Sequence, residues 1–181
     1  MEFNIEIDEY GTKHYYINNV LHREDGPALE FSNGDKFWYK NGNLHRENGP
    51  AIEWYDKEKE WYKNGERHRE DGPAIEEKCG SKHWYKNNKL HRENGPAIEF
   101  SNGDKLWYKN GELHREDGPA YEYADGTKVW YKNGELHRAD GPAIEYANNF
   151  KSFYLNGKFY GNDMRFNNES WKQFVRTLIF A

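Results

Sequence analysis

The chain contains a single cysteine, Cys79, among its 181 residues. One thiol cannot form an intramolecular disulfide framework and cannot supply a cysteine-based zinc site. Because a chain without disulfides suits a reducing compartment, we expect a cytoplasmic protein. The opening residues MEFNIEIDEYG are acidic and lack a long apolar stretch, so we expect no signal peptide.

Long hydrophobic runs and charge of one sign are also missing. Apolar residues make up 35% of the chain, and no segment approaches the roughly 20 apolar residues of a membrane span. Acids and bases are interspersed at a net charge of −5, so no basic patch points to nucleic acid or to anionic lipid. We therefore predict no membrane partner. The aromatic content of 17% is high and argues against disorder.

Proline is scarce, and all six prolines occupy one position of an internal repeat. The period is 23 residues, and it runs without a slip through six copies of a segment such as LHREDGPALEF. The repeat is marked by His22, His45, His68, His91, His114 and His137, and by Trp38, Trp61, Trp84, Trp107 and Trp130. Tyr15 and Phe153 fill the tryptophan position in the weaker copies at the two ends.

Each repeat carries the signals of two short antiparallel strands, roughly AIEY and KxWYK. Asn-Gly or Asp-Gly pairs such as 102–103 and 110–111 follow each strand, and both sets predict type I′ hairpin turns. Alternation puts Ile98 and Phe100 on one face, and Trp107 opposite to Leu106 and Tyr108. We therefore predict one all-β domain over residues 1–181, an elongated antiparallel array of β-hairpins stabilised mainly between neighbouring repeats.

The two ends depart from the repeat. Residues 1–20 predict capping strands, and the repeats fill 21–158. Within 159–181, the apolar spacing of Trp171, Phe174 and Leu178 predicts an amphipathic helix, and Ser170 with Gln173 suggests a capping box. This helix either caps the last hairpin or docks a partner, and both interpretations remain open.

The 23-residue period, the W-Y-x-N-G-x-x-H segment and the D-G turn resemble MORN repeats, especially the MORN-like repeats of the antitoxin-like YwqK group. The segment WYKNGELHREDGPAIEYADG is similar to LHRxDGPA arrays of large DNA viruses, phages and bacteria, and the resemblance covers about residues 10–158. It implies an extended β-sheet scaffold for protein association or dimerisation. It also implies a viral or phage inhibitor of a host protein, or an antitoxin-like neutraliser, and a viral protein of this kind is expected in the host cytoplasm.

The repeated His-Arg-Glu triplet invites three chemical interpretations. One histidine per repeat, spaced along an array, cannot surround one metal ion, so we predict no metal site and no cofactor. Catalysis needs one asymmetric site rather than six similar copies, so we predict no enzyme. A structural ladder of histidines, arginines and glutamates is the favoured interpretation. Repeated small-molecule or nucleotide sites are the first alternative, and stacking of single-stranded nucleic acid on the Trp-Tyr-Lys segments is another.

Function is expected where the copies differ. The turn of the second full copy reads WYDKEKEW, the next reads EEKCGSKHW, an arginine replaces the usual leucine, and Asn87-Asn88 replaces Asn-Gly. We predict that this central patch and the C-terminal helix bind another protein, through Trp54, Asp56, Glu58, Glu60, Arg67, Glu77, His83, Asn88, Trp171, Phe174 and Leu178. Drift in solvent-facing turns is the equal alternative, and a homodimer stays open.

Overall fold

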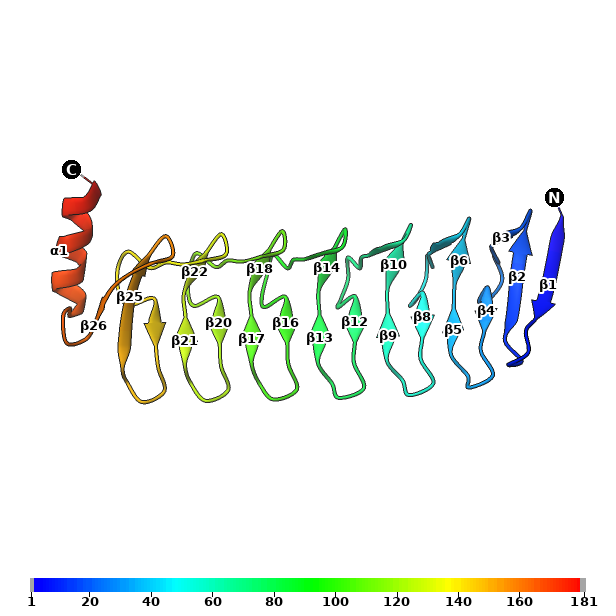
Figure 1. Ribbon diagram of the computed structural model, residues 1–181, viewed down its shortest axis with the longest axis horizontal. Helices are drawn as coiled ribbons and strands as arrows, with labels where there is room; N and C mark the ends of the chain where they lie inside the picture. The colour runs from blue at the N-terminus through cyan, green and yellow to red at the C-terminus, as the bar shows by residue number, and fades with distance from the viewer. Residues whose placement is uncertain (1, 180–181) are drawn as a thin grey trace. The chain divides into compact units, whose positions relative to one another are not determined.

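The computed structural model describes residues 2–179. The chain divides after Lys89 into two compact units, here called unit 1 and unit 2. Both are built from antiparallel β-hairpins that recur every 23 residues, and the one helix of the described residues lies at the C-terminal end of unit 2 (Figure 1). The all-β prediction with a C-terminal helix is therefore confirmed. The arrangement as a single domain stays a prediction.

In unit 1 the strands of the main sheet lie side by side in the order β1-β2-β4-β5-β8-β9-β12-β13, and short hairpins flank them (Figure 1). The strands are β1 (Phe3–Ile7), β2 (Lys13–Ile17), β3 (Val20–Leu21), β4 (Leu29–Glu30), β5 (Lys36–Phe37), β6 (Tyr39–Lys40), β7 (Asn43–Leu44), β8 (Ile52–Glu53), β9 (Lys59–Glu60), β10 (Tyr62–Lys63), β11 (Glu66–Arg67), β12 (Ile75–Glu76), β13 (Lys82–His83) and β14 (Tyr85–Lys86).

Strand β15 (Lys89–Leu90) spans the division between the units. In unit 2 the main sheet has the order β16-β17-β20-β21-β24-β25-β26. The elements are β16 (Ile98–Glu99), β17 (Lys105–Leu106), β18 (Tyr108–Lys109), β19 (Glu112–Leu113), β20 (Tyr121–Glu122), β21 (Lys128–Val129), β22 (Tyr131–Lys132), β23 (Glu135–Leu136), β24 (Ile144–Glu145), β25 (Lys151–Leu155), β26 (Lys158–Asn162) and the helix α1 (Asn168–Ile179).

The predicted strand KxWYK is divided in two. In a typical repeat β17 ends at Leu106, and β18 begins at Tyr108 in a separate two-stranded sheet. The residue between them, Trp107, donates its backbone N–H to Ala120 of the next repeat at 2.8 Å. The tryptophan therefore marks the corner where the chain leaves the main sheet, and each repeat supplies two hairpins rather than one.

The two sets of turns also differ. Asn110 and Gly111 both have positive φ (55° and 91°), which confirms the type I′ turn between β18 and β19. The Asn102-Gly103 turn belongs to the other set, and there only the glycine has a positive φ. Gly103 has φ 99° and donates its N–H to the Phe100 carbonyl at 3.0 Å. The type I′ prediction was wrong there. Phe100 N–H bonds in turn to Asp104 at 3.0 Å, so a three-residue loop with one left-handed glycine closes this hairpin.

The two faces of the main sheet carry different side chains. Ile52 pairs with Phe37 and with Glu60, whereas Glu53 pairs with Lys36 and Lys59. Because successive residues of a strand point to opposite faces, one face has an apolar row and the other a row of alternating glutamates and lysines. The alanine that precedes the first strand of each repeat is fully buried in all six copies. The core is therefore thin and repeats with the hairpins.

The helix α1 caps the end of unit 2. Trp171 is fully buried, and it packs against Phe153, Phe166 and Val175, which are also buried. The indole N–H donates to the backbone oxygen of Arg138 at 3.1 Å. Phe153 fills the tryptophan position of the last repeat, so the helix covers the place where a further repeat would stack. The capping interpretation is confirmed.

The start of the helix differs from the prediction. Asn167, one residue before α1, accepts from the Ser170 N–H at 2.9 Å, and the Ser170 hydroxyl accepts from the Asn167 N–H at 3.0 Å. This reciprocal pair closes the first turn, so the predicted capping box of Ser170 and Gln173 was wrong by one turn. The reason is that Ser170 already lies inside the helix, where its hydroxyl reaches back to the residue that starts it.

Candidate interaction surface

The arginine of each repeat joins two neighbouring repeats. Arg115 lies over the ring of Trp107, with 4.1 Å between the guanidinium carbon and the ring centre. It donates to Glu122 at 3.1 Å, to the Pro119 carbonyl at 3.3 Å and to Asp117 at 2.9 Å. The same stacking occurs for Arg23 on Tyr15, Arg46 on Trp38, Arg69 on Trp61 and Arg138 on Trp130, at 3.9–4.0 Å.

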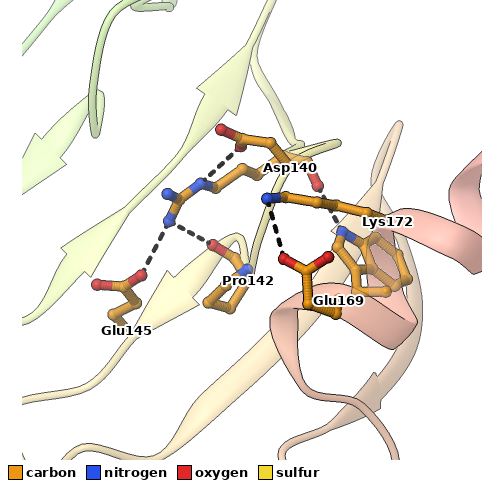
Figure 2. Close-up of polar contacts among 7 residues, drawn as sticks. Asp140, Pro142, Glu145, Glu169 and Lys172 are labelled. Atoms are coloured by element: carbon orange, nitrogen blue, oxygen red, sulfur yellow. Dashed lines mark hydrogen bonds and ion pairs between the residues drawn. The ribbon is translucent and has the colours of Figure 1, made fainter.

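Figure 2 shows the polar contacts of the last copy, where the guanidinium of Arg138 bonds to Asp140, Pro142 and Glu145. The glycine of the His-Arg-Glu-Asp-Gly segment leaves space for it. A Cβ at Gly118 would lie 2.9 Å from the guanidinium carbon of Arg115. Any larger residue would displace the arginine, so the position of the guanidinium depends on the glycine.

The histidine of each repeat holds the next type I′ turn. His22 accepts the backbone N–H of Asn41 on its Nδ1 at 3.2 Å, and the five other copies repeat the contact at 3.1–3.4 Å. In five copies the same Nδ1 also lies 2.7–3.0 Å from the side-chain oxygen of that asparagine. In two copies Nε2 lies within hydrogen-bond distance of the glutamate two residues further on: Glu47 is 3.0 Å from His45, and Glu93 is 2.9 Å from His91. Both ring nitrogens of His45 are therefore engaged within the protein.

These contacts place the repeated His-Arg groups in the scaffold. Shallow open grooves do lie between successive His-Arg loops, of about 520 Å³ between His22 and Asn48 in unit 1 and about 850 Å³ between His114 and Asp140 in unit 2. Their arginines, however, donate to carboxylates and carbonyls of their own repeat. Within residues 2–179 no three His, Cys, Asp or Glu side chains gather as a metal site would require.

The central patch contains a charged pair inside the sheet. Glu60 takes the place that Phe37 has one repeat earlier, and Arg67 takes the place of Leu44. The side chain of Glu60 is only 14% exposed, and it accepts from Arg67 at 3.2 Å, from the Tyr62 hydroxyl at 2.9 Å and from the Trp54 indole at 3.3 Å. Two predicted site residues, Glu60 and Arg67, are thus held by internal contacts.

Burial raises the pKa of Tyr62 to about 12, and the bond to Glu60 adds to the shift. A phenol with a raised pKa keeps its proton in the folded state, so this contribution to stability is present below about pH 10 and is lost as the pH rises towards about 12. We expect Tyr62→Phe to flatten the loss of stability over this alkaline range. The measurement is urea unfolding at several pH values, together with ultraviolet titration of the phenolate.

Glu60→Gln is the companion variant. It removes the carboxylate charge but keeps the burial, so we expect the Tyr62 phenol to titrate lower than in the wild type and still above an ordinary tyrosine. A Tyr62→Phe protein with the same alkaline unfolding curve as the wild type would contradict the assignment.

The next repeat holds a second polar cluster. His83, opposite Ile75 in the sheet, lies 2.8 Å from Glu77, and the Cys79 thiol donates to the same carboxylate at 3.2 Å. The bonds from Cys79 and then from His83 lower the pKa of the Glu77 carboxyl. Since the thiol is a donor here, the arrangement does not prepare Cys79 as a nucleophile. The cluster orders the turn between β12 and β13.

An open groove of about 770 Å³ lies beside these two clusters, between the turns of β8–β9 and β12–β13. It brings together four predicted site residues: Trp54, Asp56, Glu58 and Glu77. Its other lining residues, which the sequence did not single out, are Glu53, Lys57, Lys59, Glu76, Lys78, Gly80, Ser81 and Lys82. The groove therefore presents closely mixed charges around one tryptophan.

The β8–β9 turn is the irregular one. Lys57 has φ 81°, where the equivalent turns have Gly34, Gly80, Gly103, Gly126 or Asn149. A side chain in this left-handed conformation costs roughly 1–2 kcal/mol. The same turn carries Tyr55, which is 70% exposed, on its side towards Gly34. Sequence reasoning noticed the missing glycine but did not select Tyr55 or Lys57.

The remaining predicted site residues lie elsewhere. Asn88 is in the type I′ turn after β14, and its side chain accepts the Arg67 N–H at 2.9 Å. Trp171 is buried in the cap, Phe174 packs against the same cluster, and Leu178 is 44% exposed. The helix thus offers a partner little of the apolar stripe that suggested docking.

Comparison with known proteins leaves the family of the chain open. No protein-family model matches it. No curated protein matches it either. Among residues 2–179, no helix has the length and apolar character needed to cross a membrane.

Proposed function

We propose that this protein is a non-enzymatic scaffold that binds another protein through the β8–β9 turn and the groove beside it. The resemblance to MORN-like repeats supports this proposal. In its most concrete form the scaffold is a viral or phage accessory protein that inhibits a host protein, or an antitoxin-like neutraliser. The proposed partner is a protein because Trp54 and Tyr55 are of the aromatic types enriched at protein interfaces, and the charges around them are not of one sign.

Lys57 is the observation that carries the proposal. Turns elsewhere in the array have glycine or asparagine at this position, so a relaxed sequence exists within the chain itself. Strain that a simple substitution would remove is a mark of a functional segment. Beside Lys57, the exposed ring of Tyr55 supplies the kind of anchor that dominates many interfaces.

The test is to give this turn the sequence SNGD that residues 32–35 and 101–104 carry. We expect the variant Tyr55→Ser, Asp56→Asn, Lys57→Gly, Glu58→Asp to be more stable than the wild type by about 1 kcal/mol, because the strained lysine is gone. We also expect it to lose the partner. Urea unfolding measures the first effect, and quantitative affinity capture from cells that express the chain measures the second.

Unit 2 offers a matched control, because residues 124–127 read ADGT and can be changed to the same SNGD. A specific partner should be recovered by the wild type and by this control, and at least about tenfold less by the turn variant. If every captured protein is recovered equally by all three, the β8–β9 turn is not the binding site.

A further inference from the structure

Among residues 2–179, strand β1 has a paired neighbour on one side only, β2, and so forms an edge of unit 1. It pairs with β2 along its whole length, from Phe3 opposite Ile17 to Ile7 opposite Lys13. All five of its residues are exposed, and the three apolar ones are at least half exposed: Phe3 58%, Ile5 50% and Ile7 65%. A five-residue apolar edge strand is a template for pairing with another strand.

The backbone of β1 directs three residues outward. Asn18 donates to the Glu2 carbonyl at 2.9 Å, and Asp8 donates to Thr12 at 3.1 Å, so even-numbered residues of this segment bond towards β2. Tyr15, which lies opposite Ile5, instead donates to Ala28 on its other side at 2.8 Å. Because bonding direction alternates along a strand, the N–H and C=O groups of Phe3, Ile5 and Ile7 face outward.

We infer that β1 binds β1 of a second copy of this chain, antiparallel, about a twofold axis at Ile5. Three residue pairs then form: Phe3 with the partner's Ile7, Ile5 with the partner's Ile5, and Ile7 with the partner's Phe3. All of them are hydrogen-bonding positions. One face of the new sheet joins apolar side chains, and the other joins Asn4 to the partner's Glu6. This inference does not depend on the proposed function.

The apolar residues of β1 select this register, because only this pairing places Phe3, Ile5 and Ile7 opposite one another. Asn4 already donates to Glu6 within one strand at 2.9 Å, so the amide can serve the partner's carboxylate equally well. A shift of two residues one way would leave Phe3 opposite the partner's Glu9 and place Glu6 opposite the partner's Glu6, and like charges directly opposite each other on paired strands are destabilising. The Ile5-centred pairing sets like charges opposite each other only outside β1, where Glu2 faces the partner's Asp8.

The pairing surface is small. A strand of five residues is about 17 Å long, which gives an interface below the roughly 1,200 Å² of a standard stable complex. We therefore expect a concentration-dependent dimer with a dissociation constant in the micromolar range or weaker. A protein of 21.6 kDa should shift between one and two copies in sedimentation equilibrium from low to several hundred micromolar.

The first test is Ile5→Lys. It places two ammonium groups opposite each other at the axis, and we expect the dimer dissociation constant to rise at least about tenfold. Because Ile5 is exposed, circular dichroism and urea unfolding should show an intact fold. Val20→Lys is the matched control, since Val20 is 42% exposed but lies in β3, away from this edge. A chain that stays monomeric at all concentrations, or a dimer that Ile5→Lys leaves unchanged, would overturn the inference.

The second test reads the register in a Cys79→Ser background. Paired Cα atoms at hydrogen-bonded positions are about 5.5 Å apart, so Ile5→Cys should be linked to the partner's Cys at the same position by a short thiol-specific cross-linker. Asn4→Cys should not be, because Asn4 pairs with the partner's Glu6. Equal cross-linking of both variants would contradict the twofold axis at Ile5.

Discussion

Replacing Trp171 with alanine is expected to lower the free energy of unfolding by about 3–5 kcal/mol. The side chain is fully buried, its ring packs 5.2 Å from both Phe153 and Phe166, and its N–H holds the Arg138 carbonyl. Its removal leaves a cavity at the point where the last repeat meets the helix. Since each repeat is stabilised mainly by its neighbours, loss of the cap should also loosen β25 and β26.

Urea unfolding followed by far-ultraviolet circular dichroism measures this loss. Leu178→Ala is the control on the same helix, because Leu178 is 44% exposed and should cost well under about 1 kcal/mol. Hydrogen exchange of the amides in β25 and β26 shows whether the end of unit 2 opens first. If Trp171→Ala and Leu178→Ala lowered the free energy of unfolding by equally small amounts, the packing of α1 would not stabilise the end of unit 2.

The repeat itself could be predicted because its signals are local. Asn110-Gly111 requires only a two-residue turn, and both residues have the predicted positive φ. Asn102-Gly103 has the same letters but a different turn. The difference lies in the length of the loop: Phe100 bonds to Asp104 across three residues, and the Asp104 side chain accepts the Ala124 N–H of the next repeat at 2.7 Å.

The position of Trp107 could not be read from alternation. A period of two continues through the letters KLWYK, yet the chain turns at the tryptophan. The reason is tertiary: Trp107 bonds through its backbone to Ala120 and stacks under Arg115, and both belong to the following repeat. A contact between repeats therefore divides what looks locally like one strand.

The sequence could predict only part of the candidate site, because contacts between residues distant in the chain are not visible in it. Breaks in the repeat pointed to a segment in which Trp54, Asp56, Glu58 and Glu77 meet at one groove. The same breaks could not show that the side chain of Glu60 is only 14% exposed. Glu60 replaces an apolar residue, and Arg67 replaces a leucine. The Arg67 Nε donates to the Glu60 carboxylate at 3.2 Å, so the two charges neutralise each other, and the sequence alone does not reveal this pair.

Replacing Arg115 with alanine is expected to lower the free energy of unfolding by about 2–4 kcal/mol, the combined loss of a cation–π contact and charge-assisted hydrogen bonds. The guanidinium covers Trp107 and bonds to Glu122 and to the Pro119 carbonyl. Glu122 is about one-third exposed, so water can rehydrate it and limit the loss. Lysine lacks the planar fork, so Arg115→Lys should retain only part of the stability.

Other copies of the repeat supply the control for Arg115→Ala. Asp117 also bonds to Arg115, which lowers the pKa of its carboxyl, but Asn48 and Asn94 occupy the same position in other copies. We therefore expect Asp117→Asn to be only slightly less stable than the wild type at neutral pH, because the carboxylate is exposed and water weakens its ion pair. A carboxyl with a lowered pKa stabilises the fold above its ordinary pKa and loses that effect as the pH falls, so this small difference should disappear at acid pH. Urea unfolding at neutral and acid pH separates the two. If Arg115→Ala instead unfolded like the wild type, the arginine would not stabilise the fold. Repeated ligand binding at the His-Arg loops would then become the better explanation of the conserved spacing of these arginines within the chain.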